Sequence, residues 1–242
     1  MTGDMDARSM TSTESAEQRR HPRLGFQVPF LHRERAPEAS RVGVGWTRNI
    51  SEAGACLELA ELLEPRTPLR IRLRTDWGFV EADAEVTWAL AQQSVWAREG
   101  GPLQGGVLHG ALFNRIASER PEGFRDWLGT RKNGRSGGIR LPADLSVLCY
   151  RRQGPIGPVH GRTRDINRKG AQLLLPEMLH VGTSLDLLFM PENGSFPVQA
   201  TVAWVNPATS ETPGSLVRHG VRFPALSWSS SLSLGLALTV LG

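Results

Sequence analysis

The stretch NISEAGACLEL (49–59) returns 116 residues later as DINRKGAQLLL (165–175). Three further pairs of segments follow in the same order: PLRIRL (68–73) with SLDLLF (184–189), EVTW (85–88) with TVAW (201–204), and HGALF (109–113) with HGVRF (219–223). The first two of these pairs keep the spacing of 116, whereas the last pair is 110 residues apart. Ordered matches at one spacing indicate an internal repeat. The chain is therefore predicted to contain two copies of one domain.

Each copy reads as an all-β domain. In VEADAEVTW (80–88) apolar residues alternate with carboxylates, which is typical of a strand with one buried and one wet face. We expect six strands in the first copy, near 25–31, 41–48, 54–60, 67–74, 78–90 and 105–114. Six short antiparallel strands leave no exposed sheet edge when they close into a barrel, so we predict two tandem six-stranded β-barrels.

A short helix is expected to follow each barrel. In SERPEGFRDWLGTRK (118–132), Pro121 suits a first helical turn and Gly129 an end, and the helix would cover one barrel opening. The segment RKNGRSGG (131–138) has the composition of a linker. The predicted organisation is a disordered tail at 1–16, a first domain at 17–130, the linker at 131–138 and a second domain at 139–242.

Composition excludes several classes of protein. Both cysteines, Cys56 and Cys149, lie in apolar runs and read as reduced core residues. No stretch reaches the ~18 apolar residues of a membrane span, and the N-terminus lacks the apolar middle of a signal peptide. We therefore expect a cytoplasmic protein without a membrane span.

The charge and the titratable residues argue against nucleic-acid binding and against catalysis. Residues 1–130 carry 16 basic and 18 acidic side chains, and residues 131–242 carry 12 and 6. The basic second half leaves a weak nucleic-acid-binding protein as one alternative. The six histidines show no metal-ligand spacing and no P-loop or G-x-S-x-G element is present, so we expect no enzyme, no catalytic residue, no metal and no cofactor.

Two short motifs stand together in the first copy. RRHPR contains Arg19 and Arg23 four residues apart, with Arg20 between them, and NISEAG contains Asn49, Ser51 and Gly54 in the pattern N-x-S-x-x-G. An arginine arm ahead of a small β-barrel, with a D/N-x-S-x-x-G turn between its strands, resembles the PilZ domain. The resemblance covers about residues 17–130 and includes HGALF as the last strand.

This resemblance implies a receptor for the bacterial second messenger cyclic di-GMP. An arginine fork binds phosphate oxygens bidentately, stacks on bases and pairs with guanine O6 and N7. Asn49 would accept from a guanine edge and Ser51 would bind base or phosphate. Gly54 would allow positive φ or a close approach to the ligand. The expected ligand-binding set is Arg19, Arg20, Arg23, Asn49, Ser51 and Gly54.

The second copy departs from the pattern. DINRKG keeps Asp165 and Gly170 but has Asn167 where serine is expected. A spacing of 116 places Arg135 opposite Arg19 and Ile139 opposite Arg23. Arg131 with Arg135, or Arg135 with Arg140, could supply the missing pair only through a longer connection. We expect Arg135, Asp165, Asn167 and Gly170 to be degenerate equivalents that bind no ligand.

No output module is visible in the sequence, so the signal is expected to pass to a partner protein. The resemblance suggests that this partner belongs to motility, attachment or polysaccharide machinery. A ligand-independent interaction scaffold with PilZ-like domains is the second alternative.

The last segment, FPALSWSSSLSLGLALTVLG (223–242), contains no charged side chain. Its place in the repeat favours a helix, although its leucines also alternate as in a strand. So apolar a segment is expected to be covered. Its cover is either the chain's own domains or another subunit, which would make a homo-oligomer through 223–242.

Overall fold

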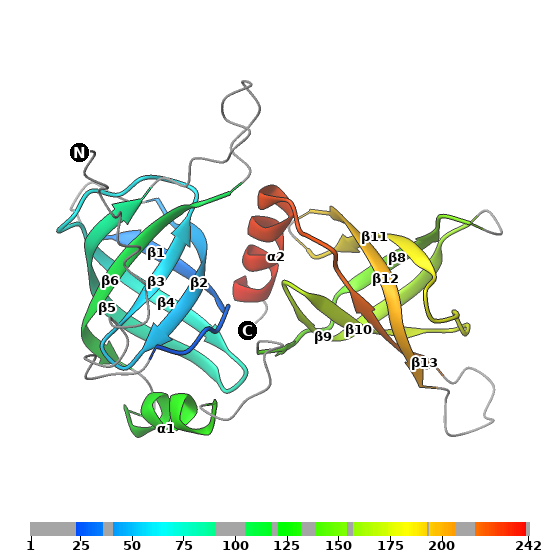
Figure 1. The fold of residues 1–242 in the computed structure, drawn as a ribbon, viewed down its shortest axis with the longest axis horizontal. Coiled ribbons are helices and arrows are strands. Elements are labelled where there is room, and N and C mark those ends of the chain that lie inside the picture. Colours follow the sequence, from blue (N-terminus) through cyan, green and yellow to red (C-terminus); the bar gives the residue numbers. More distant parts are fainter. Residues whose placement is uncertain are drawn as a thin grey trace, which may run out of the picture.

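The computed structural model describes residues 23–35, 41–90, 105–117, 121–131, 139–153, 157–192, 194–206 and 216–240. The expected tail at 1–16, Arg19, Arg20 and residues 132–138 of the expected linker lie outside them. Figure 1 shows two β-domains side by side with one helix between them. This arrangement confirms the predicted tandem of β-barrels.

The first barrel is closed and antiparallel. Its strands run in the order β1, β2, β3, β6, β5, β4, and β1 pairs with β4 to close it. Their bounds are β1 Pro29–Glu34, β2 Gly43–Ser51, β3 Gly54–Leu59, β4 Pro68–Thr75, β5 Gly78–Leu90 and β6 Val107–Ala117.

The second barrel repeats this arrangement. Its sheet runs β10, β13, β12, β11, β8, β9, and pairing of β9 with β10 closes it, while the short β7 adds to β9. The bounds are β7 Leu141–Pro142, β8 Ser146–Arg151, β9 Val159–Asn167, β10 Gly170–Leu175, β11 Ser184–Met190, β12 Phe196–Asn206 and β13 Val217–Arg222.

The predicted alternation is visible along the strands. In β4, Leu69, Ile71 and Leu73 are buried while Arg70 points to solvent and binds Glu81 of β5 (Nη2–Oε2 2.6 Å). Both interiors are filled by such inward residues, which is how a small barrel excludes water from its centre.

One expected strand begins later than predicted. We placed the first strand at 25–31, whereas β1 covers Pro29–Glu34. The Thr47 hydroxyl accepts from the Val28 N–H (3.0 Å) and donates to the Phe26 carbonyl (2.7 Å). These bonds to a side chain hold residues 26–28 in place without a strand ladder.

Matching contacts show the repeat at the level of single atoms. Thr163 makes the same two bonds to Leu145 and Ala143 in the second barrel. The His109 Nε2 accepts from the Leu63 N–H at 3.0 Å, and the His219 Nε2 accepts from the Leu179 N–H at the same distance. The two donor residues, Leu63 and Leu179, are 116 residues apart. The two histidines are thus structural, as their repeat positions suggested.

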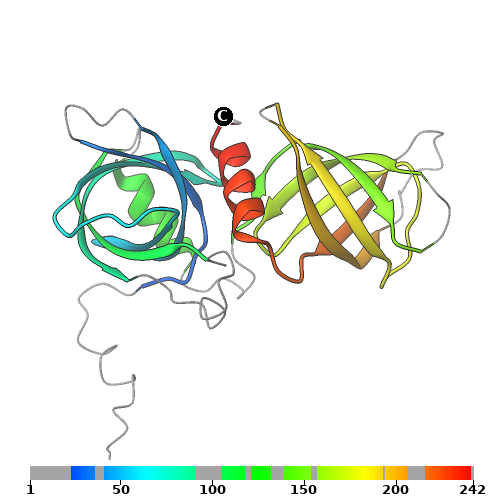
Figure 2. The same cartoon turned by 90° about the horizontal axis from the view of Figure 1, so that it is seen from above.

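Helix α1 (Pro121–Arg131) closes one opening of the first barrel. Its Phe124, Trp127 and Leu128 are buried, and Trp127 meets Phe26 edge to face with ring centroids 6.1 Å apart. Figure 1 shows it beneath the first barrel, and in Figure 2, which looks down that barrel, it lies within the ring of strands. We expected Gly129 to end this helix and residue 131 to begin the linker. The helix instead runs to Arg131, whose guanidinium binds Asp76 at the end of β4.

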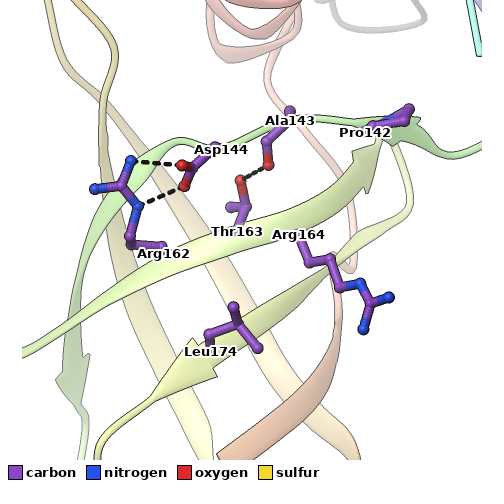
Figure 3. A pocket seen from close by; sticks show the side chains of 7 residues that line it. All are labelled: Pro142, Ala143, Asp144, Arg162, Thr163, Arg164 and Leu174. Atoms are coloured by element: carbon purple, nitrogen blue, oxygen red, sulfur yellow. Dashed lines mark hydrogen bonds and ion pairs between the residues drawn. The ribbon is translucent and has the colours of Figure 1, made fainter. Parts of the chain in front are cut away.

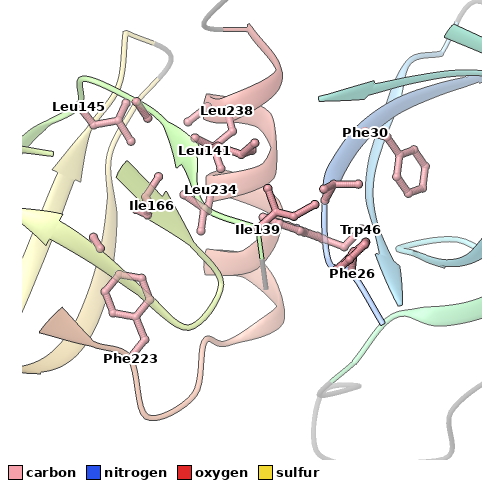
Figure 4. Close-up of a cluster of buried hydrophobic side chains, with 14 of the residues drawn as sticks. Phe26, Phe30, Trp46, Ile139, Leu141, Leu145, Ile166, Phe223, Leu234 and Leu238 are labelled. Atoms are coloured by element: carbon pink, nitrogen blue, oxygen red, sulfur yellow. The ribbon is translucent and has the colours of Figure 1, made fainter. Parts of the chain in front are cut away.

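Helix α2 (Trp228–Val240) occupies the space between the barrels, which confirms the expected helix and excludes the strand. Its Leu234 and Leu238 point toward Leu141, Leu145 and Ile166 of the second barrel (Figure 4). They lie 110 residues after Phe124 and Leu128 of α1, so α2 closes the second barrel as α1 closes the first.

The opposite side of α2 packs on the first barrel. The Trp46 Nε1 donates to the Ser231 carbonyl at 2.8 Å, and Gly235 lies against Trp46 and Val44. The chain's own barrels thus cover two sides of this helix, as one of the two expected alternatives has it, while a homo-oligomer through 223–242 stays a prediction. None of the described helices is long and apolar enough to cross a bilayer.

Candidate ligand-binding site

A β-bulge presents two consecutive side chains of β2 on the outer face of the first barrel. Thr47 lies opposite Leu57 and Asn49 opposite Cys56, so Arg48 is an extra residue without a partner in β3. Bulges of this kind re-aim side chains and are frequent beside functional sites. Here the bulge places Arg48 next to Asn49, the first residue of the N-x-S-x-x-G motif.

The end of the arginine arm lies beside the same residues. Leu24 and Ile50 exchange two backbone hydrogen bonds, with N–O distances of 2.8 and 2.9 Å. The exposed Arg23 is consequently held next to the segment that carries Asn49 and Ser51. Its charge acts on the pKa of the Cys56 thiol, which burial raises and which the cations of Arg23 and Arg48 lower. The structure thus brings together Arg23 and Asn49, which are 26 residues apart in sequence.

Asn49 is the motif residue with unused hydrogen-bonding capacity. Its Oδ1 is buried and has no hydrogen-bond partner among the described residues. An amide oxygen accepts up to two hydrogen bonds, and a buried one left empty is costly. A ligand that offers N–H donors at this position would satisfy it.

Ser51 and Gly54 build the turn. The Ser51 hydroxyl is 5% exposed and donates to the Gly54 carbonyl at 3.1 Å, which closes the motif on itself. Gly54 has no positive φ, and a Cβ there would lie 2.2 Å from the Ala111 carbonyl oxygen. The positive φ expected for Gly54 is thus wrong: glycine is needed here because the backbone approaches strand β6 closely. Its close approach to a ligand stays a prediction.

The structure also corrects the alignment of the second motif. Leu141 pairs with Ile166 as Leu24 pairs with Ile50, so the spacing is 117 in this segment and Arg140, not Ile139, is the counterpart of Arg23. Arg135 lies outside the described residues.

In the second copy the motif residues bind one another. The Arg140 Nη1 donates to the Asp165 Oδ1 at 2.7 Å, so the carboxylate that would receive a guanine edge is already paired. The Asn167 Oδ1 accepts from the Lys169 N–H at 2.9 Å, and a Cβ on Gly170 would lie 2.2 Å from the Val221 carbonyl oxygen. That the second copy binds no ligand stays a prediction.

A surface hollow of about 790 Å³ lies on the second barrel, away from the first motif. Figure 3 shows Arg162 bound to Asp144 on one side of it and Arg164 extending on the other. Its lining residues, Pro142, Ala143, Asp144, Arg162, Thr163, Arg164 and Leu174, are repeat counterparts of a face of the first barrel. On the first barrel, α2 and Arg168 cover that face.

The described residues offer little for nucleophilic or metal chemistry. Both cysteines are buried, and burial raises the pKa of the Cys149 thiol to about 12. In the part of the chain that the structure describes, no group of three or more His, Cys, Asp or Glu side chains is placed to hold a metal ion.

Sequence reasoning missed two residues near the site: Arg48 and the buried Glu58. A signal for the first was present, because an arginine precedes the motif in both copies (Arg48 before Asn49, Arg164 before Asp165). Nothing in the pattern marked Glu58, which occupies an outward strand position that ordinarily faces water.

Comparison with known families supports this arrangement of motifs. The family model of the PilZ domain matches residues 17–96 and again residues 130–231. The chain belongs to the PilZ domain family. Both halves match, so this PilZ protein is a tandem, and the second copy still resembles the family despite its altered motif.

Several solved structures resemble this PilZ protein at low identity. MrkH of K. pneumonia in its apo state shares 14% identity over 87% of this chain and 85% of that chain, with a TM-score of 0.36. YcgR from Escherichia coli, in complex with c-di-GMP, shares 13% over 86% and 82%, with a TM-score of 0.33. The Bacillus subtilis inhibitor of motility, MotI/DgrA, shares 10% over 88% and 95%, also at 0.33. No curated protein matches this chain.

Proposed function

We propose that this protein is a receptor for cyclic di-GMP and that the ligand binds to its first PilZ domain. The observation that carries the proposal is the position of Arg23 beside Asn49, whose buried Oδ1 lacks a partner among the described residues. Membership of the PilZ family supports the choice of ligand, and a solved YcgR structure holds c-di-GMP.

The chemistry of the residues fits the two parts of this ligand. Asn49 accepts from the N–H groups of a guanine edge. Arg19, Arg20 and Arg23 provide guanidinium forks, which bind phosphate oxygens in pairs and stack on bases. The arm that carries them folds over the ligand, and this closure is the conformational signal that a partner protein reads.

The proposed output is a protein of the motility, attachment or polysaccharide machinery, reached without catalysis by this chain. The protein then acts as a cytoplasmic receptor whose own domains supply binding and a change of shape. MotI is named as an inhibitor of motility, which makes motility the first output to test.

Calorimetric titration of the purified full chain with cyclic di-GMP tests the site. We expect the double variant Arg19→Ala, Arg23→Ala to bind at least about tenfold more weakly, because each hydrogen bond to a charged group contributes about 1.5–3 kcal/mol. The matched control is Arg140→Ala, which removes the counterpart of Arg23 from the second domain and should leave the affinity unchanged.

Two outcomes contradict the proposal. Unchanged affinity in the double variant rejects the site, and no binding by the unaltered chain rejects the receptor. If the unaltered chain does not bind cyclic di-GMP, salt-dependent binding to generic duplex DNA supports the nucleic-acid-binding alternative. If it binds neither, the ligand-independent interaction scaffold is supported.

A further inference from the structure

Glu58 is a buried carboxylate that joins the two domains. It lies on the outer side of β3 opposite Trp46 of β2, yet it is only 2% exposed. Arg48 of the same barrel approaches it with an Nε–Oε2 distance of 3.2 Å and an Nη2–Oε1 distance of 3.3 Å. Arg168 of the second domain donates to the Oε2 at 2.7 Å. One carboxylate is therefore shared by two arginines from different domains.

Arg168 belongs to the motif turn of the second domain, DINRKG at 165–170. Its guanidinium lies 5.3 Å from the ring centroid of Trp46 and contacts the Ser231 hydroxyl at 3.3 Å. Cation–π and ion-pair contacts of a desolvated arginine hold a specific geometry. The motif turn of the second domain is thus part of the contact that docks this domain on the first.

Arg48 lies beside the proposed ligand site and also beside Glu58. It shares the bulge with Asn49, and its cation, like that of Arg23, offsets part of the rise that burial causes in the pKa of Cys56. Its Nε is buried without a well-aligned hydrogen bond, although Glu58 is near. A guanidinium carries five N–H donors, so Arg48 has donors to spare for an anion bound beside Asn49.

We propose that Arg48 is a further ligand-binding residue, shared between Glu58 and a phosphate of cyclic di-GMP, and that Arg168 keeps Glu58 paired when Arg48 turns to the ligand. The inference rests on the proposed function and adds to it a link between the ligand site of the first domain and the second domain. A buried carboxylate that loses its partner is strongly destabilising. In the docked molecule, where Glu58 is buried, the Arg168 contact removes that cost and so raises the affinity of the first domain for the ligand.

The link works in both directions. If the Glu58–Arg168 contact between the docked domains strengthens ligand binding, ligand binding strengthens this contact by the same factor, because coupling between two binding events is reciprocal. The ligand thereby tightens the Glu58–Arg168 contact and fixes the relative orientation of the two barrels.

The second domain provides a matched control. Arg164 occupies the repeat position of Arg48, but Leu174 stands at the position of Glu58. Arg164 forms no ion pair with any residue that the structure describes, and it lies at the open hollow of Figure 3. Substituting Arg164 removes the same charge from the equivalent bulge of the second domain without affecting the shared carboxylate, Glu58.

The test is a double-mutant cycle read by calorimetric titration of the full chain with cyclic di-GMP. We expect Arg48→Ala and Arg168→Met each to weaken binding by at least about fivefold, the lower end of typical coupling between sites. Methionine retains an apolar stem on Trp46. In the Arg48→Ala background, Arg168→Met should change the affinity by less than about twofold, since the coupling requires both arginines. Arg164→Ala should bind as the unaltered chain does.

Circular dichroism and the thermal midpoint establish that each variant is folded. If the unaltered chain binds and either Arg48→Ala or Arg168→Met binds equally well, the proposal that Arg48 is shared between Glu58 and the ligand is wrong. The proposed receptor function is then unaffected. Independent, additive losses leave Arg48 as a ligand residue and overturn the link through Glu58. If the unaltered chain does not bind at all, the proposed function fails and this inference fails with it.

Discussion

At the scale of single residues, the glycine that ends each motif has a steric explanation. Gly54 and Gly170 each pass a neighbouring strand so closely that a Cβ would lie 2.2 Å from a backbone carbonyl oxygen. Backbone cannot move aside as a long side chain can, so only glycine fits. The glycine of N-x-S-x-x-G is thus required by the barrel whether or not a ligand binds.

We predict that Gly54→Ala lowers the free energy of unfolding by about 1–3 kcal/mol or more, the usual cost of overpacking. Chemical denaturation measures it. The control is Gly129→Ala on the exposed side of α1, where nothing lies within 4 Å of the added Cβ. That change should stabilise the protein by roughly 0.5–1 kcal/mol, because alanine favours a helix over glycine. Similar effects of the two substitutions would contradict the steric explanation.

At the scale of elements, α2 differs from α1 in having two partners. Leu234, Ala237 and Leu238 close the second barrel, while Gly235 allows the first barrel to approach the other side. The absence of charge over 223–242 follows from this position, because a charged side chain on either side would be buried between barrels.

We predict that Leu238→Ala destabilises the chain by about 2–5 kcal/mol, as expected when a fully buried leucine leaves a cavity. Leu238 is 2% exposed, whereas Leu236 on the same helix is 39% exposed. Leu236→Ala should therefore have a much smaller effect on the urea midpoint. Equal losses from the two leucines would mean that α2 is not packed between the barrels in solution.

At the scale of the whole molecule, buried histidines in both barrels make stability depend on pH. Burial, and next the charge of His109, lower the pKa of His32 to about 4; burial also lowers the pKa of His109 and of His219. The folded protein therefore binds these protons less readily than the unfolded chain. Their contribution is complete above the ordinary histidine pKa of about 6.5 and is lost as the pH falls from there toward 4.

We predict that the free energy of unfolding falls between pH 7 and pH 5, by up to about 2 kcal/mol for His32 alone, since each pH unit below 6.5 corresponds to about 1.4 kcal/mol. Urea unfolding at several pH values measures this slope. His180 is exposed, so His180→Gln should leave the slope unaltered. A flat profile from pH 7 to pH 5 would show that these histidines are not held neutral by burial.

The architecture followed from patterns along the chain. Strand alternation such as that of β4 and the spacing of 116 residues predicted two barrels, and the motif letters predicted the family. These features are local, because a strand's inward and outward positions have a period of two and a repeat copies each element in order. The position of α2 in the repeat likewise predicted its helix.

Contacts between distant segments could not be predicted in this way. The alignment by sequence placed Ile139 opposite Arg23, because the connection from β8 to β9 is one residue shorter than that from β1 to β2. This difference becomes visible only through the pairing of the strands. Glu58 has the outward position of a solvated residue and is buried because Arg168, 110 residues later, is docked on it. A buried carboxylate is tolerated there because arginines of both domains pair with it, and that assembly depends on tertiary packing, which no local period encodes.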